Sequence, residues 1–228
     1  MHYYIITGAS RGLGKALAEE ILRQPDTTVI GVSRHATIEH ERYHHRPLDL
    51  SDILAVEANL FTVFAPHPDA SSLTLINNAA VLGQIGYVGE LPNEHFTFAF
   101  DVNLVAPAML MNTFLRNYAA MTCPRTILNI SSGAAQRAVD GWAAYSASKA
   151  ALDALSRAIQ KEQDLRGTGV RVQTISPGVL DTGMQEQIRN TDNRQFSEVN
   201  KFVAFHAEDK LADPVEVARK ILASLQAK

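Results

Sequence analysis

The sequence predicts an α/β protein built on one doubly wound parallel sheet with helices on both faces. Segments of strand and helix character alternate along the whole chain, and a glycine-rich turn joins the first strand to the first helix. The length of 228 residues fits one such domain, or at most two small ones. Six runs are the predicted strands: Tyr3–Thr7, Thr28–Val32, His44–Leu48, Leu73–Asn77, Thr126–Ile130 and Val170–Ser176.

Helices are expected between these strands, and one more helix follows the last strand. Asp213 is the expected N-cap of that last helix, because a proline occupies its first helical position. Residues 180–211 lack sheet periodicity and are expected to form a substrate loop near the carboxyl ends of the strands. We therefore expect a single domain over residues 1–228. The predicted helices are Gly12–Arg23, Asp52–Phe64, Glu94–Ala119, Tyr145–Arg166 and Pro214–Gln226.

The composition argues against several classes of function. A formal net charge of −3 gives no basic surface for nucleic acid. Cys123 is the only cysteine, so no intrachain disulfide can form and a reducing compartment, the cytoplasm, is expected. No apolar run approaches the ~20 residues of a membrane span, and the N-terminus lacks signal-peptide features. His35, His40, His44 and His45 cluster in sequence, but neighbouring strand residues face opposite ways and no metal site is expected.

The glycine-rich turn is the first chemical motif. Residues Thr7–Gly14 read T-G-A-S-R-G-L-G and open the first helix. Glycines at this spacing allow a tight turn whose backbone approaches a pyrophosphate at the helix N-terminus. The spacing differs from the usual G-x-G-x-x-G, so an ordinary strand–helix turn is the alternative. The predicted dinucleotide contacts here are Gly8, Ser10, Arg11, Gly12, Leu13 and Gly14.

The end of the second strand favours NADP over NAD. An NAD-selective site places an acidic residue there to bind the adenosine ribose. This chain instead reads Val32-Ser33-Arg34, without a carboxylate. Arg34, with Arg11 in the neighbouring turn, is expected to pair with a 2′-phosphate, because a guanidinium matches phosphate geometry. The alternative is that both arginines are merely solvated.

Tyr145 and Lys149 are the predicted catalytic pair. Their four-residue spacing places them on one face of a helix, one turn apart. A lysine ammonium near a phenol is expected to lower the tyrosine pKa from ~10, towards the range that a general acid needs. Ser132, at the end of a strand, is expected to hold a carbonyl oxygen beside the phenol. Its alternative role is to form the turn Ser131-Ser132-Gly133.

Asn103 lies inside the predicted helix Glu94–Ala119. Pro107 has no N–H to donate to the main-chain carbonyl of Asn103, four residues earlier. We therefore expect a kinked helix and an Asn103 carbonyl that is free to hold water. A kink that serves packing alone is the alternative.

Together these motifs resemble the single-domain branch of the short-chain dehydrogenase/reductase family. The resemblance covers most of the chain, with the motifs in the family's order. It implies a Rossmann-type sheet of six to seven strands in the order 3-2-1-4-5-6, and an enzyme that uses NADP(H). The matching residues are Thr7–Gly14, Asn77-Asn78-Ala79-Ala80, Asn103, Ser132, Tyr145, Lys149 and Pro177-Gly178.

The resemblance also implies roles for individual residues. Ser132 would orient the substrate carbonyl and Tyr145 would give it a proton. Lys149 would bind the nicotinamide ribose and tune Tyr145, while Asn103 would hold a relay water. The other implied cofactor contacts are Asp49 and Leu50 at the adenine, Asn77 and Ala79 at the ribose, and Pro177, Gly178, Val179 and Thr182 at the nicotinamide end.

Within the family, the segments Ser176–Gln185 and Asn129–Ala134 look most like those of bacterial benzil reductases and the related sepiapterin reductases. This likeness implies NADPH-dependent reduction of a ketone, an aromatic or α-dicarbonyl compound, to the hydroxyketone. Trp142 and Met184 are expected to border the substrate, with core packing as the alternative. The competing interpretations are an NAD(P)-dependent alcohol dehydrogenase and a non-catalytic NADP-binding sensor on the same fold.

Two departures from the family pattern bear on the turn after the fourth strand and on assembly. Ala80 replaces the usual glycine and crowds that turn. Family members usually continue into a seventh strand that serves one common subunit interface, whereas this chain ends soon after Pro214–Gln226, so the resemblance does not imply a tetramer formed through that edge. A homodimer through the long helices is expected instead, because a stripe of small residues permits close packing; packing of this stripe on its own sheet is the alternative. The stripe comprises Ala147, Ala151, Ala154 and Ala158.

Overall fold

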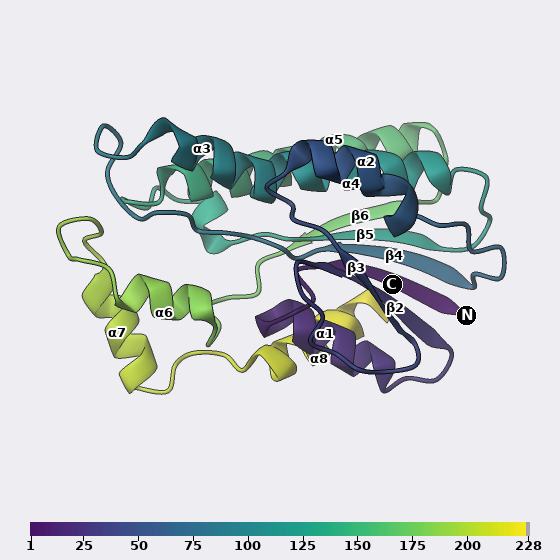
Figure 1. Cartoon of the computed structure of the whole chain (residues 1–228), viewed down its shortest axis with the longest axis horizontal. Helices are drawn as coiled ribbons and strands as arrows, with labels where there is room; N and C mark the ends of the chain where they lie inside the picture. The colour runs from purple at the N-terminus through teal and green to yellow at the C-terminus, as the bar shows by residue number, and fades with distance from the viewer. Residues whose placement is uncertain (227–228) are drawn as a thin grey trace.

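A six-stranded parallel sheet forms the centre of the protein (Figure 1). The structure, a computed structural model, describes residues 1–226. The strand order is β3-β2-β1-β4-β5-β6 and every pairing is parallel, so the predicted fold class and strand order are confirmed. The strands are β1 (His2–Thr7), β2 (Thr27–Ser33), β3 (Tyr43–Pro47), β4 (Ser72–Asn77), β5 (Arg125–Ile130) and β6 (Arg171–Ile175).

The central strands are continuous apolar runs. Ile5 of β1 pairs with Ile30 of β2 and Leu75 of β4, and all three side chains are buried. Such runs are typical of parallel strands that are covered on both faces. Successive side chains alternate between the faces, so Ile5 and Ile6 belong to separate cores on the two sides of the sheet.

Helices cover both faces of the sheet (Figure 1). One face carries α2, α4 and α5, and its core includes Val56 and Leu110. The other face carries α1 and α8, and its core includes Leu17 and Ile221. Asp213 accepts a hydrogen bond from the Val215 N–H at 2.8 Å and caps α8 as predicted. The helices are α1 (Gly12–Leu22), α2 (Ile53–Val63), α4 (Ala106–Asn117), α5 (Ala143–Leu165) and α8 (Pro214–Gln226).

The predicted helix Glu94–Ala119 is interrupted where the sequence places its kink. It consists of α3 (Asn93–Phe100), the π-helical turn η1 (Asp101–Val105) and α4. The Ala106 N–H reaches back five residues to the Asp101 carbonyl, which widens the helix just before Pro107. The whole stretch has the length and mean hydropathy of a membrane span, but half of its most apolar window is buried, so it is a core helix.

The segment 180–211 contains two helices that the sequence analysis did not predict. They are α6 (Gly183–Arg189) and α7 (Val199–Ala207). Both are short, and their buried residues, such as Ile188 and Phe202, pack on one another and on Trp142 rather than on the sheet. Their apolar residues therefore do not follow the regular helical spacing by which a helix that covers a sheet is recognised in a sequence. Within residues 1–226, no strand pairs with the outer edge of β6.

Candidate active site

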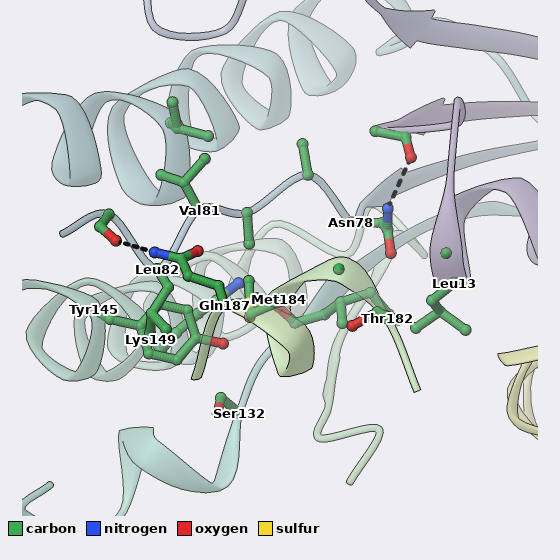
Figure 2. Close-up of a pocket in the computed structure, with 18 of the residues that line it drawn as sticks. Leu13, Asn78, Val81, Leu82, Ser132, Tyr145, Lys149, Thr182, Met184 and Gln187 are labelled. Atoms are coloured by element: carbon green, nitrogen blue, oxygen red, sulfur yellow. Dashed lines mark hydrogen bonds between the residues drawn. The ribbon is translucent and has the colours of Figure 1, made fainter. Parts of the chain in front are cut away.

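A cavity of about 1090 Å³ opens at the carboxyl ends of the strands. Ser132, Tyr145 and Lys149 lie at one end of it, and Leu13 and Asn78 at the other (Figure 2). Three predicted site residues, Gly14, Asn77 and Asn103, are not among the lining residues. The predicted residues that do line the cavity are Gly8, Ser10, Arg11, Gly12, Leu13, Arg34, Asp49, Leu50, Ala79, Ser132, Tyr145, Lys149, Pro177, Gly178, Val179 and Thr182.

The glycine turn leaves no room for side chains at two positions. Gly8 has a φ of +67°, and a Cβ there would lie 2.9 Å from the Ala79 Cα. A Cβ at Gly14 would lie 2.3 Å from the Gly8 carbonyl oxygen. Gly14 is therefore a packing position that does not line the cavity, and its predicted contact with the cofactor stays a prediction. The close packing keeps a bare backbone turn at the cavity wall, which is the shape that a pyrophosphate needs.

The N-terminus of α1 lies at this turn and is not capped by a side chain. Arg11 is the N-cap residue, and its side chain makes no capping hydrogen bond. The first N–H groups of the helix and its dipole are therefore available to an anion. The Thr37 hydroxyl donates to the Ser10 carbonyl at 2.8 Å and fixes the turn from the side of β2. The region fits a dinucleotide phosphate.

Arg34 and Asp49 lie at the β2–β3 side of the cavity. Asp49 accepts hydrogen bonds from the Ser51 N–H at 3.0 Å and from the Ser51 hydroxyl at 2.8 Å. The main-chain bond from Ser51, its hydroxyl and the positive charge of Arg34 hold the pKa of Asp49 below its usual range. The Arg34 side chain is exposed at the cavity. A guanidinium is therefore exposed at this side of the cavity, and no carboxylate directly follows β2.

The structure places Asn78 at the cavity and Asn77, the predicted ribose contact, in the core. Asn77 is buried, and its Nδ2 donates to the Asn129 Oδ1 at 2.8 Å, because Asn77 still lies in β4 opposite Asn129. Asn78 lines the cavity instead, and its Nδ2 donates to the Thr7 carbonyl at 2.9 Å (Figure 2). The N–H groups of Asn78 and Ala79 both donate to the Thr7 hydroxyl at 3.0 Å. These bonds tie the end of β4 to the glycine turn.

The predicted catalytic side chains converge. Ser132 is the N-cap of the short 3₁₀ turn η2 (Gly133–Ala135), where its Oγ accepts from the Ala134 N–H at 3.2 Å. Its own O–H can still donate, and the side chain also hydrogen-bonds to the Tyr145 phenol. The Lys149 Nζ donates to the Ile130 carbonyl at 2.7 Å and lies 6.0 Å from the centroid of the Tyr145 ring. Ser132 thus both forms the turn and belongs to the site.

The expectation that Lys149 lowers the pKa of Tyr145 is wrong for this structure. Burial raises the pKa of the phenol, and the hydrogen bond from Ser132 offsets only part of that effect. The lysine ammonium is directed at the Ile130 carbonyl and not at the phenol oxygen. The hydroxyl is protonated at neutral pH, as an unperturbed phenol also is, but the raised pKa makes it a weaker acid.

Burial also changes the pKa of Lys149. Its side chain is buried, and this burial lowers its pKa to about 8, although the negative charge of Asp153 acts in the opposite direction. The ammonium form therefore persists at neutral pH and is lost as the pH rises through about 8. The protonation state of Lys149 therefore changes within the pH range in which enzymes work.

Asn103 supports the cavity wall from behind. It is fully buried in η1, where its Oδ1 accepts from the Val81 N–H and its Nδ2 donates to the Val81 carbonyl, both at 2.8 Å. The same Nδ2 donates to the Ser148 hydroxyl at 3.1 Å, and that hydroxyl donates to the Tyr145 carbonyl at 2.7 Å. The side chain thus ties the Val81 segment to the catalytic helix. That its main-chain carbonyl holds a water stays a prediction.

Trp142 and Met184 line the cavity next to the catalytic tyrosine. The indole ring meets the Tyr145 ring edge-on, with centroids 6.0 Å apart, and stacks on Phe196 with centroids 5.0 Å apart. Phe196 is fully buried, and Met184 packs against the same aromatic cluster. Trp142 therefore belongs both to a small core and to the cavity wall, so the two interpretations of it do not exclude one another.

The motifs and the geometry agree with a known family. The sequence matches the short chain dehydrogenase family over residues 2–193. The chain belongs to the short-chain dehydrogenases. A benzil reductase ((S)-benzoin forming) of Bacillus cereus is 34% identical over 231 residues, which cover 97% of this chain and 92% of the relative. A sepiapterin reductase of Mus musculus is 30% identical over 242 residues, covering 97% of this chain and 90% of that protein.

A solved structure supports the same assignment. The crystal structure of the KRED1-Pglu enzyme superimposes with a TM-score of 0.84 at 27% identity, covering 99% of this chain and 94% of that one. As a short-chain dehydrogenase, the protein is an oxidoreductase that acts on CH–OH or C=O groups with a nicotinamide cofactor, NAD(P). The turn at Gly8 and the uncapped start of α1 fit the phosphates of that cofactor.

Two cavity residues of this short-chain dehydrogenase carry no sequence motif and were not predicted. His95 of α3 is buried, its Nδ1 accepts from the Gln84 N–H at 3.1 Å, and burial lowers its pKa. Gln187 of α6 donates to the Gly83 carbonyl at 2.6 Å, and this bond joins two walls of the cavity (Figure 2). Only the tertiary structure brings these residues to the site, because their neighbours in sequence have no pattern typical of a ligand site.

We predict that Asn103→Ala lowers the free energy of unfolding by about 2–4 kcal/mol. The variant removes three buried side-chain hydrogen bonds and leaves the partner groups of Val81 unsatisfied. Urea unfolding followed by circular dichroism measures the loss. Asn112→Ala, on the exposed surface of α4, is the control and should change stability by less than about 0.5 kcal/mol. Equal stability of the two variants would contradict the supporting role of Asn103.

Proposed function

We propose that this protein is an NADPH-dependent carbonyl reductase that converts a ketone to an alcohol, with Tyr145 as the proton donor. The observation that carries the proposal is the convergence of Ser132, Tyr145 and Lys149 at one end of a cavity whose other end is the bare glycine turn. A long cofactor that is held by its phosphates at that turn would extend along the cavity towards these three side chains.

The nicotinamide cofactor, when bound, supplies the hydride. In the proposed reaction the Ser132 hydroxyl donates a hydrogen bond to the substrate carbonyl oxygen and holds it beside the phenol. Tyr145, which is protonated at neutral pH, gives its proton to that oxygen as negative charge develops. The Lys149 ammonium, one helical turn away, stabilises the resulting phenolate and holds the ribose hydroxyls. Exclusion of water by Trp142 and Met184 strengthens these interactions.

The preference for NADPH rests on charge. Arg34 is exposed at the β2–β3 side of the cavity, whereas the Arg11 guanidinium lies near Gly183. A 2′-phosphate placed beside Arg34 would meet a guanidinium group. Asp49, the nearby carboxylate, is already bonded to Ser51, which leaves Arg34 available for the phosphate.

The proposed substrate is an aromatic or α-dicarbonyl compound. Trp142 and Met184 offer a flat ring and a polarisable sulfur at the cavity wall, which favour planar aromatic groups. A neighbouring carbonyl also eases hydride attack on the reacting carbonyl. The relatives named benzil reductase and sepiapterin reductase agree with this class of substrate.

The proposed assembly is a homodimer in the cytoplasm. Ala147, Ala154 and Ala158 of the small-residue stripe are exposed on α5, so they do not pack on their own sheet. Exposed small residues on a long helix permit the close approach of a second helix. Cys123 is free, in keeping with a reducing compartment.

Tyr145→Phe should lower turnover by at least about 10²-fold and leave NADPH binding within a factor of a few, because only the transferable proton is lost. NADPH absorbance measures turnover and cofactor fluorescence measures binding. Tyr4→Phe, a half-buried strand residue outside the cavity, is the control and should keep full activity. Normal turnover of Tyr145→Phe would end the proposed mechanism.

Arg34→Asp should weaken NADPH binding by roughly tenfold to a hundredfold, the strength of a charge-assisted hydrogen bond, and improve binding of NADH. The added carboxylate repels the 2′-phosphate and accepts ribose hydroxyls. Titration with both cofactors gives the ratio of the two Kd values. Arg166→Asp, an exposed change outside the cavity, should leave that ratio unchanged. A wild-type protein that uses NADH as well as NADPH would refute the role of Arg34.

Benzil or a pterin with a diketone side chain should be reduced with a kcat/KM at least about tenfold above that of an unactivated ketone of similar size, and one enantiomer of the hydroxyketone should dominate. Tenfold corresponds to about 1.4 kcal/mol of transition-state stabilisation. Steady-state kinetics and chiral chromatography of the product test both statements. Equal kcat/KM values or a racemic product would contradict the substrate class but leave the reductase itself in place.

Ala154→Glu should convert the dimer to a monomer, because it places a bulky charge in the proposed helix contact. Light scattering after size-exclusion chromatography measures the mass. Ala223→Glu on the exposed surface of α8, at the opposite face of the sheet, should leave the dimer intact. A monomeric wild-type protein would exclude the proposed assembly.

A further inference from the structure

Asp153 is a buried acidic residue next to the catalytic pair. It lies on α5 one turn after Lys149, and its side chain is buried together with that of Lys149. Acidic residues are seldom buried unless a partner compensates the loss of hydration. The reaction derived from Ser132, Tyr145 and Lys149 does not involve this carboxylate, so its place in the core needs another reason.

The hydrogen bonds of Asp153 are incomplete. Its Oδ2 accepts from the Gln136 Nε2 at 3.2 Å. Its Oδ1 is buried and has no hydrogen-bond partner among residues 1–226. A buried carboxylate oxygen without a donor costs free energy, and such groups persist mainly where function requires them. The compensation must therefore come from charge.

Lys149 is the cation that can provide this compensation. Its Nζ is bonded to the Ile130 carbonyl and it makes no direct hydrogen bond with Asp153, so the two act on each other through the poorly screened interior. Among the described residues, Asp153 is the only charged group with a marked effect on Lys149, and it opposes the larger effect of burial. Tyr145 and the exposed Arg157 are the other titratable groups at one-turn spacing on this face of α5, and the buried phenol of Tyr145 is neutral at neutral pH.

We propose that Asp153 is a positioning residue whose negative charge keeps Lys149 in its ammonium form during the reaction. The proposal rests on the proposed roles of Tyr145 and Lys149, and it does not depend on the substrate or on the choice of NADPH over NADH. The helix α5 thus carries three functional side chains, one turn apart, in the order proton donor, cation and counter-charge.

Asp153 could instead act only by holding the serine turn against α5 through its hydrogen bond with Gln136, in which case its charge would not matter. Gln136 is the C-cap of η2, the turn whose N-cap is Ser132, so the Gln136–Asp153 bond also joins the serine turn to α5. Gln136 is exposed, and it can therefore be changed without disturbing the core. Substitutions at residues 136 and 153 distinguish the effect of the Asp153 charge from the effect of the Gln136–Asp153 hydrogen bond, which we call the tether.

The experiment measures kcat and the Kd of NADPH between pH 6 and 9.5 in the wild type and three variants. Asp153→Asn removes the charge with little change of shape. Gln136→Lys places an ammonium beside Asp153 and neutralises its field from the surface. Gln136→Met breaks the tether but keeps the carboxylate. Circular dichroism and thermal melting establish that each variant is folded.

The wild type should lose activity and NADPH affinity as the pH rises through about 8, where Lys149 loses its proton. Asp153→Asn and Gln136→Lys should move this alkaline limb to lower pH. Each full pH unit of movement lowers the value at pH 8 about fivefold relative to that at pH 6. Gln136→Met should leave the limb in place, within about twofold of the wild type at every pH.

The proposal would be overturned if activity and NADPH affinity declined at the same alkaline pH in Asp153→Asn and Gln136→Lys as in the wild type. It would also be overturned if the decline in Gln136→Met moved to lower pH as far as in Asp153→Asn. If Asp153→Asn does not fold, Gln136→Lys carries the test alone, because it leaves the core unchanged. The binding arm distinguishes this proposal from the proposed function. A protein that binds NADPH with the expected pH shifts but reduces no carbonyl would keep Asp153 as the counter-charge and reject the reductase.

Discussion

The parallel pairing of all six strands is the constraint on which the active site depends. Parallel neighbours cannot be joined by a hairpin, so each connection crosses a face of the sheet and every strand ends at the same edge. That edge receives the glycine turn after β1, Arg34 after β2, Asn78 after β4 and Ser132 after β5. Residues far apart in the sequence thus become walls of one cavity.

Buried polar side chains then fix the geometry of that edge. Thr7 accepts from the main chain of Asn78 and Ala79, which locks the end of β4 to the glycine turn. Asn103 does the same on the other side, where it joins the Val81 segment to the catalytic helix through Ser148. Such networks are costly when incomplete and rigid when satisfied. They explain why the helix through η1 is widened at the position where the asparagine must reach inward.

The ionisable groups of the site follow from the same burial. Removal from water raises the pKa of the Tyr145 phenol and brings the pKa of Lys149 down to about 8, so burial opposes both proton release by the phenol and the charge of the cation beside it. A negative charge at Asp153 opposes the lowering of the Lys149 pKa. The balance between solvent exclusion and charge compensation decides the pH range in which the pair can work.

The sequence by itself determined the doubly wound fold, the glycine turn and the candidate triplet of Ser132, Tyr145 and Lys149, because these depend on local patterns: apolar runs, glycine spacing and the one-turn separation of Tyr145 and Lys149. The strand order followed from the family resemblance that these motifs carry. Only the tertiary structure decided that Asn77 faces the core while Asn78 faces the cavity, and that residues 180–211 form two helices. It also reversed the expected direction of the Tyr145 pKa shift. The physical reason is that burial, side-chain direction and field strength depend on neighbours distant in sequence, and no local pattern records them.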